Sequence, residues 1–359
     1  MVHTSCGKMR NMDSANSGTP IGVHSEKVLV LGGSGFIGTR LTSALTARNI
    51  PVRIGDIRPS EYFPHLWARC DVRDEGSLRE AMRDVCTIVN LAAEHRDDVR
   101  PLSRYHETNV EGASAVCAAA SREGIRKILF TSSVAVYGMH PHPVDETGPF
   151  EPFNPYGETK LEAEGVYRAW TMEDSSRTLV IVRPTVVFGE GNRGNVYNLA
   201  RQIASGRFMM VGSGTNTKSI AYVGNVAAFL VHSLSFGRGL HIFNYVDTPD
   251  LNTRDLVGYI QSCLGKPGKS PRIPISIALA TGNVLDLIAR ATGRTFPISA
   301  IRVRKFSAST QFRADRVARS GFSPPFSLRE SLARTVDFEF SQKSCGSAGN
   351  TNERLEPLL

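Results

Sequence analysis

The sequence, 359 residues long, lacks the features that mark metal-binding, secreted and membrane-spanning proteins. Its six cysteines, at positions 6, 70, 86, 117, 263 and 345, show no metal-ligand pairing, so we expect reduced thiols in a reducing compartment. No stretch approaches the roughly 18 apolar residues of a membrane span. The first 24 residues have no apolar signal core. These absences predict a cytoplasmic protein without a membrane span.

Long runs of one charge are also absent. The net charge is +8 and the isoelectric point about 9.3, values that raise the possibility of a nucleic-acid partner. No run of five or more basic residues occurs, however. The densest basic group consists of Arg302, Arg304, Lys305, Arg313, Arg316 and Arg319. Either this group is a solvated face or it attracts a small anionic substrate such as a nucleotide diphosphate, and we favour the second reading over nucleic acid.

A glycine-rich turn is the most informative feature that is present. Four apolar residues, 28–31, predict a buried parallel strand, and glycines 32, 35 and 38 follow it before an expected helix over 39–45. This arrangement allows a sharp turn and places a pyrophosphate at the positive end of the helix. A second strand, 52–55, leads to Asp56, where a carboxylate that binds ribose is expected. Together these features predict a dinucleotide site.

The rest of the chain predicts an α/β fold. Apolar strands alternate with helical patterns from 26 to about 190, which favours a doubly wound parallel sheet of the Rossmann type. Expected strands lie at 87–93, 127–133, 179–184 and 241–245. Expected helices lie at 77–82, 108–122, 195–205, 253–264, 275–291 and 327–340. We predict a disordered leader (1–25), a dinucleotide-binding domain (26–190), a smaller and partly interleaved C-terminal substrate-binding lobe (191–342) and a disordered tail (343–359).

A tyrosine and a lysine form the predicted catalytic pair. Tyr156 and Lys160 are four residues apart, so a helix places them on one face. Tyrosine ordinarily has a pKa near 10, but a nearby ammonium and a positively charged nicotinamide both favour the phenolate, which makes Tyr156 a competent general base. Ser133 ends an upstream strand and is expected to donate a hydrogen bond to the substrate oxygen. Lys160 is also expected to hold the nicotinamide ribose.

At this point the chain resembles the extended short-chain dehydrogenase/reductases, in particular the nucleotide-sugar epimerases and dehydratases. The resemblance rests on the segments 32–38, 91–93, 131–138 and 183–184, together with the Tyr156 and Lys160 pair. It implies a tightly held NAD, catalysis by Ser133, Tyr156 and Lys160, and a homodimer formed through helices around 105–120 and 156–172. The implied cofactor-binding residues are Gly32, Gly35, Phe36, Ile37, Gly38, Asp56, Asp71, Val72, Leu91, Ala92, Ala93, Asn109, Tyr156, Lys160 and Pro184. The implied substrate-binding residues are Ser133, Tyr156, Arg183, Asn195, Lys218 and Arg304. No metal ligand is expected.

The residues after Ser133 reduce the number of candidate reactions. Dehydratases of this kind carry an acidic pair there, whereas this chain has Val134 and Ala135, which cannot transfer a proton. A UDP-hexose or UDP-N-acetylhexosamine 4-epimerase is therefore the leading interpretation. A nucleotide-4-keto-sugar reductase that uses NAD(P)H is the first alternative, because Val186 and Lys218 replace the asparagine and arginine of well-known 4-epimerases.

Two further alternatives concern other classes of protein. A hydroxysteroid- or flavonol-type dehydrogenase would suit the amphipathic stretch 273–291 as a helix that leans on a membrane. A non-catalytic protein that senses NAD(P) is disfavoured, since this chain keeps the tyrosine and lysine pair. Asp56 favours NAD over NADP, because a carboxylate repels a 2′-phosphate.

Overall fold

A computed structural model describes residues 27–96, 99–268, 270–292 and 299–340. The predicted leader (1–25) and tail (343–359) therefore lie outside the described residues. A parallel sheet of seven strands, in the order β11-β6-β5-β4-β1-β2-β3, forms the centre. The strands are β1 (Val28–Leu31), β2 (Val52–Asp56), β3 (Trp67–Arg69), β4 (Thr87–Asn90), β5 (Lys127–Thr131), β6 (Thr178–Pro184) and β11 (Gly239–Tyr245). The strand order reverses between β1 and β4, and such a switch point is where doubly wound sheets bind ligands.

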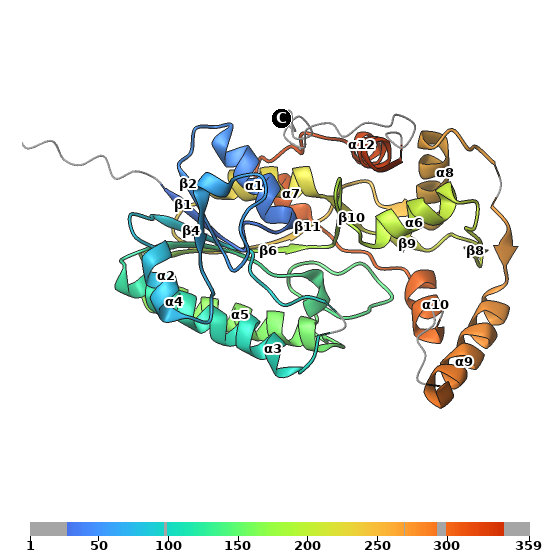
Figure 1. Ribbon diagram of the computed structural model, residues 1–359, viewed down its shortest axis with the longest axis horizontal. Helices are drawn as coiled ribbons and strands as arrows, with labels where there is room; N and C mark the ends of the chain where they lie inside the picture. Colours follow the sequence, from blue (N-terminus) through green and yellow to red (C-terminus); the bar gives the residue numbers. More distant parts are fainter. Residues whose placement is uncertain (1–26, 97–98, 269, 293–298, 341–359) are drawn as a thin grey trace, which may run out of the picture.

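Helices cover both faces of this sheet (Figure 1). On one side lie α1 (Phe36–Thr46) and α7 (Val223–Ser233), and on the other α2 (Glu75–Ala81), α4 (Gly112–Arg122) and α5 (Pro155–Met172). Because successive side chains of a strand point to opposite faces, alternate residues of β1 enter different layers. Leu29 and Leu31 pack toward α2, α4 and α5, whereas Val28 and Val30 pack toward α1 and α7. Both faces of β1 are therefore core, as its continuous apolar run predicts.

A second group of elements packs beyond the carboxyl ends of β1 and β6. It contains α6 (Asn195–Ala204), α8 (Thr253–Cys263), α12 (Leu328–Phe340) and the strand pair β7 (Val186–Phe188) and β10 (Ile220–Tyr222). These elements share an apolar cluster that includes Phe188, Tyr222, Ile260 and Leu332. Between β10 and α8 the chain returns to the sheet through α7 and β11, and β11 pairs along β6. The two parts of the molecule are thus joined by α7 and β11.

Short elements complete the described chain. Two small strand pairs are β9 (Thr217–Lys218) with β12 (Leu251–Asn252) and β8 (Met210–Val211) with β13 (Arg272–Ile273). Helices α9 (Ile275–Thr292) and α10 (Ala300–Ser307) form a pair that lies away from the sheet at the lower right of Figure 1. The remaining elements are η1 (Pro64–Leu66), α3 (Ser103–His106), η2 (Glu107–Glu111), η3 (Val134–Val136) and α11 (Asp315–Arg319).

Three expected elements differ from the structure. The strand expected over 87–93 ends at Asn90, because the Asn90 side chain accepts a hydrogen bond from the Ala92 amide (3.0 Å) and turns the backbone away. The helix expected over 108–122 is interrupted by the π-helical turn η2. The strand expected over 127–133 ends at Thr131, since Ser133 caps η3. Each difference lies at the carboxyl edge of the sheet. Helix α10 had no counterpart among the expected elements.

Candidate active site

The glycine turn after β1 is packed too tightly for any other residue. Gly32 has a φ of +73°, and a Cβ there would lie 2.7 Å from the Ala92 amide nitrogen. A Cβ on Gly38 would lie 2.5 Å from the Gly33 Cα. Helix α1 begins at Phe36, directly after Gly35, which has no side chain to cap it. The turn therefore presents the bare N-terminus of α1 at the switch point of the sheet, which fits a dinucleotide pyrophosphate.

Asp56 lies beside this turn at the end of β2. Its carboxylate is 8% exposed and accepts hydrogen bonds from the amides of Ser34 (3.1 Å) and Arg58 (3.0 Å). Two amide donors on one carboxylate hold it rigidly, and a carboxylate still has lone pairs for ribose hydroxyls. The position of Asp56 therefore fits the predicted role. Arg58 contributes its backbone, while its side chain is exposed.

Asp71 and Val72 follow β3 on the adjacent loop. The Arg73 guanidinium binds both carboxylate oxygens of Asp71, at 3.0 and 2.7 Å, and this contact lowers the pKa of Asp71. Val72 is buried against Gly112 of α4, where a Cβ would come within 2.9 Å of the valine side chain. Val72 thus anchors the loop by packing on α4. Contact of Asp71 with the adenine stays a prediction.

The start of α5 holds the predicted catalytic tyrosine next to Ser133. The Asn154 side chain caps α5 by accepting from the Gly157 amide (2.8 Å), and Pro155 begins the helix. Tyr156 follows in the first turn, and the Ser133 side chain is close enough to lower the pKa of its phenol. The Ser133 hydroxyl oxygen also accepts from the Ala135 amide (3.1 Å). A Cβ on Gly157 would lie 2.6 Å from the Ala135 carbonyl oxygen, so η3 and α5 are in close contact. The structure therefore brings the two predicted hydroxyl groups together.

Burial shifts the pKa values of both residues of the predicted catalytic pair. It raises the pKa of Tyr156, and the hydrogen bond from Ser133 partly opposes this rise. Lys160 is 2% exposed; its Nζ donates to the Thr131 carbonyl (2.8 Å) and lies 4.6 Å from the centre of the Phe130 ring. Burial lowers the pKa of Lys160 to about 7, against the charge of Glu164. The described residues alone therefore do not favour the predicted Tyr156 phenolate, and the expected contribution of a positively charged nicotinamide stays a prediction.

Asn109, in the π-helical turn η2, links two segments of the candidate site by hydrogen bonds. Its side chain is buried, accepts from the Glu94 amide (2.8 Å), and donates to the Glu94 carbonyl (3.1 Å) and the Thr159 hydroxyl (3.0 Å). Both of its N–H groups are therefore used within the protein. Asn109 ties the segment after β4, which carries Leu91, Ala92 and Ala93, to α5. Its geometry is that of a positioning residue for the predicted cofactor site.

Two further hydroxyl residues lie at the end of β5, Thr131 and Ser132, for which the sequence predicted no role of their own. Thr131 and Ser132 are buried, and neither hydroxyl has a hydrogen-bond partner among the described residues. They directly precede Ser133, and Thr131 also supplies the carbonyl that holds Lys160. A buried hydroxyl without a partner is costly, so these groups fit a polar ligand at this edge of the sheet. The run of hydroxyl residues in the sequence pointed to this edge of the sheet, but only Ser133 was predicted as a site residue.

Arg183 does not reach the site. Its side chain has 0% exposure and forms an ion pair with Glu164, with Nε to Oε1 at 2.7 Å and Nη2 to Oε2 at 2.5 Å. Its Nη1 donates to the Tyr137 hydroxyl and to the Glu146 carbonyl. The expectation that Arg183 binds substrate is therefore wrong for this conformation, because the guanidinium is buried and makes four hydrogen bonds inside the core. Pro184, the next residue, ends β6 and is also buried.

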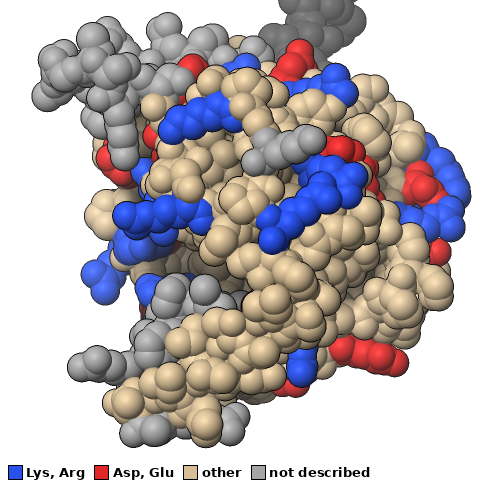
Figure 2. Space-filling view, turned by 90° about the vertical axis from the view of Figure 1, so that its right-hand side faces the viewer, with Lys and Arg blue, Asp and Glu red and all other residues tan. Residues whose placement is uncertain are grey.

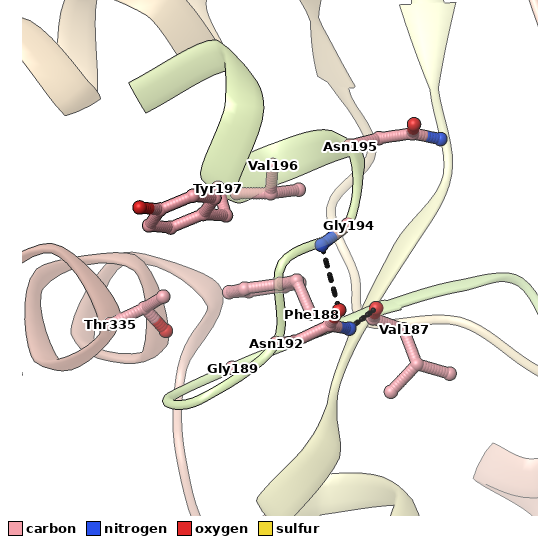
Figure 3. A pocket seen from close by; sticks show the side chains of 9 residues that line it. All are labelled: Val187, Phe188, Gly189, Asn192, Gly194, Asn195, Val196, Tyr197 and Thr335. Carbon is pink, nitrogen blue, oxygen red and sulfur yellow. Dashed lines mark hydrogen bonds between the residues drawn. The ribbon is translucent and has the colours of Figure 1, made fainter. Parts of the chain in front are cut away.

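The other expected substrate-binding residues lie farther along the chain. The Lys218 Nζ donates to the Ala308 carbonyl just after α10, and burial lowers the pKa of Lys218 to about 8. Arg304 is exposed on α10. Asn195 begins α6 and is exposed; in Figure 3 its side chain points away from Tyr197 and Thr335, which line a small pocket below α6. None of Ser133, Tyr156 and Lys160 lines that pocket. Roles for Asn195, Lys218 and Arg304 stay predictions.

Comparison with known proteins decides the family. Residues 28–245 match the model of the NAD dependent epimerase/dehydratase family. The chain belongs to this family. NAD is therefore its cofactor, and the predicted α/β Rossmann fold is confirmed. Within the part of the chain that the structure describes, no helix is long and apolar enough to cross a membrane.

Among curated members of the family, N-acetyl-alpha-D-glucosaminyl-diphospho-ditrans,octacis-undecaprenol 4-epimerase of Escherichia coli O157:H7 is 46% identical over 318 residues, which cover 88% of this chain and 96% of that protein. UDP-glucose 4-epimerase of Vibrio cholerae is 26% identical, with 87% and 94% covered. The fold is shared with a solved UDP-glucose 4-epimerase complex with NAD from Thermus thermophilus, at a TM-score of 0.68, 21% identity, and 87% and 98% coverage. The chain is thus an enzyme of the epimerase/dehydratase family.

Proposed function

We propose that this enzyme is an NAD-dependent 4-epimerase of an N-acetylhexosamine that is linked through a diphosphate to its carrier. The observation that carries the proposal is the contact between Ser133 and Tyr156 at the start of α5, followed by Val134 and Ala135 instead of acidic residues. The site thus offers one proton acceptor at one hydroxyl, which suits reversible oxidation of a single carbinol. The relative at 46% identity supports the sugar and the reaction.

The carrier has two possible sources with the same diphosphate chemistry. Nucleotide sugars are the substrates that the sequence predicts, and two curated or solved relatives are UDP-glucose 4-epimerases. The relative at 46% identity is instead named for a sugar on undecaprenyl diphosphate. Lys218 is the candidate diphosphate contact in either case, since a lysine supplies a compact positive charge.

The chain's own residues account for proton movement in the reaction. Gly32, Gly35, Gly38 and Asp56 would hold NAD, which supplies the hydride acceptor when bound. Tyr156 takes the proton from the sugar C4 hydroxyl through its phenolic oxygen as hydride leaves C4. After the 4-keto sugar has turned over, hydride adds back to the other face of C4, and Tyr156 returns the proton to the C4 oxygen. Ser133 donates a hydrogen bond to the same oxygen and keeps it aligned throughout.

The test supplies purified enzyme with UDP-N-acetylglucosamine, and separately with N-acetylglucosamine on a short-chain polyprenyl diphosphate, without added nicotinamide. We expect the 4-epimer to form from at least one of them, with no net change in absorbance at the NADH band. Conversion of one substrate alone identifies the carrier. If both stay unchanged while a 4-keto-sugar nucleotide is reduced at the expense of NAD(P)H, the enzyme is a reductase and the proposal is wrong.

We also propose that the enzyme works in the cytoplasm as a homodimer, with most of the chain after residue 190 forming the substrate lobe. Exposed residues of α5 are small or polar along much of its length, for example Glu158, Glu162, Gly165 and Ala169. Together with α4 they offer a surface on which two copies can pack helix against helix. Light scattering should give twice the monomer mass. A monomeric mass at micromolar concentration would contradict this arrangement.

A further inference from the structure

Helix α9 presents an apolar face to the outside of the molecule. Ile277 is 56%, Val284 58% and Leu287 69% exposed. These residues recur at spacings of seven and three, so they follow one side of the helix, and Ile288 on the same side is 41% exposed. On α10, Ile301 is also 52% exposed. Contiguous exposed aliphatic side chains of this kind mark an interaction site.

The described acidic residue of α9, Asp286, is turned toward α10 instead. Asp286 accepts a hydrogen bond from the Ala300 amide (3.0 Å) at the start of α10. A Cβ on Gly282 would lie 2.6 Å from the same amide nitrogen, so α10 packs closely on this side. Successive residues of an α-helix are about 100° apart, which places Asp286 roughly opposite Val284. The acidic group is thus directed away from the apolar face.

Exposed basic residues lie on and next to the helix pair. Arg272 is exposed just before α9, and Arg304 is exposed on α10. In Figure 2 the lower part of the molecule, where the two helices lie, is largely free of charged side chains, with Lys and Arg side chains above it. No described helix can span a membrane, and an apolar stripe edged by cations is the pattern of a helix that lies in the plane of a membrane surface.

We infer that the outer face of α9, together with Ile301 of α10, docks on an anionic lipid bilayer. The inference deepens the proposed function in its lipid-carried form, because a polyprenyl chain stays in the bilayer while its sugar diphosphate must reach the enzyme.

Contacts between the helix pair and the strand that carries Lys218 support a membrane as the partner of this face. The Asn216 side chain donates to the Phe306 carbonyl of α10 (2.8 Å), and Lys218 holds the Ala308 carbonyl and forms a β-bridge with Thr310. The helix pair is thus attached to the strand that carries the candidate diphosphate contact.

The test is sedimentation of the full-length enzyme with vesicles of phosphatidylcholine and phosphatidylglycerol at a ratio of about 3:1, compared with pure phosphatidylcholine. We expect wild type to sediment with the anionic vesicles, less with neutral ones, and less at high salt. The variant Val284→Ser/Leu287→Ser/Ile288→Ser should lose at least about tenfold in apparent lipid affinity. Leu287→Ser alone should show a smaller loss in the same direction.

The matched control is Met172→Ser, since Met172 is 85% exposed on α5; its sedimentation should equal that of wild type. The inference is overturned if wild type fails to sediment, if the triple variant sediments like wild type, or if the triple variant instead halves the mass in solution, which would assign the face to a second copy. Epimerase activity is measured separately, with UDP-N-acetylglucosamine in the absence of vesicles, so that a failure of membrane docking and a failure of the proposed function can be told apart. Vesicle binding without epimerisation of any substrate would refute the function alone.

Discussion

Tyr156 is the residue on which the proposed reaction depends most. Tyr156→Phe removes the phenolic oxygen that takes and returns the C4 proton, so we expect kcat to fall by roughly 10²–10⁴-fold, the usual contribution of positioned acid–base catalysis. NAD should remain bound. Tyr259→Phe is the matched control, because Tyr259 lies on α8 in the outer apolar cluster and should keep full activity. Near wild-type turnover of Tyr156→Phe in steady-state kinetics would refute the mechanism.

Asp56 is expected to set the choice of cofactor. Asp56→Ala should weaken NAD binding by about 1–3 kcal/mol, the scale for losing hydrogen bonds to a charged group, and should reduce discrimination against NADP. Arg58→Ala is the control, since Arg58 gives Asp56 only its backbone amide. Titration calorimetry measures both variants. Tighter binding of NADPH than NADH by wild type would contradict the assignment.

Lys160 links pH to stability. Burial lowers its pKa from the ordinary 10.5 to about 7. Between these two pH values the unfolded chain holds a proton that the native enzyme has lost, so the free energy of unfolding rises with pH, by at most about 1.4 kcal/mol per unit from this group. Urea unfolding at pH 7 and pH 9 should therefore show a larger gain for wild type than for Lys160→Met. Equal gains would mean that Lys160 keeps its ordinary pKa.

At the scale of the element, the first turn of α5 must approach η3 closely. Gly157→Ala adds a Cβ 2.6 Å from the Ala135 carbonyl oxygen, so we expect lower kcat and lower thermal stability as Tyr156 moves away from Ser133. Gly165→Ala lies in the same helix with no atom within 4 Å of the new Cβ. It should be neutral or stabilise by up to about 1 kcal/mol. If both variants behave alike, the contact with η3 is unimportant.

The elements that the sequence predicted best are those in which local pattern and packing agree. Val28–Leu31 is apolar and buried on both faces, and its strand was predicted with its observed bounds. The end of β4 was missed, because the side chain of Asn90 competes there with the sheet for the Ala92 amide. The role of Arg183 was misjudged because its partner Glu164 lies 19 residues away on α5. Spacing along the chain contains no information on such a contact.

At the scale of the whole molecule, Arg183 joins parts that are distant in sequence. It connects β6 to Glu164 of α5, to Tyr137 and to the Glu146 carbonyl. Arg183→Met leaves a buried carboxylate without its main partner, a loss of about 3–5 kcal/mol in comparable cases. Arg168→Met removes a partly exposed contact with the same carboxylate (3.2 Å) and should cost about 0–1 kcal/mol. Denaturant unfolding measures the loss of stability in both variants. Equal losses would show that the buried ion pair of Arg183 is no more important for stability than the contact of Arg168.

The order in which the strands are made has a consequence for synthesis. The partner of β6 on its outer side is β11, which comes only after residues 185–238. While those residues leave the ribosome, the backbone groups along one edge of β6 have no strand to pair with, and an unpaired edge invites pairing between chains. A nascent chain that stalls or is cut before residue 239 should therefore aggregate or recruit a chaperone, whereas one released after Tyr245 closes its sheet.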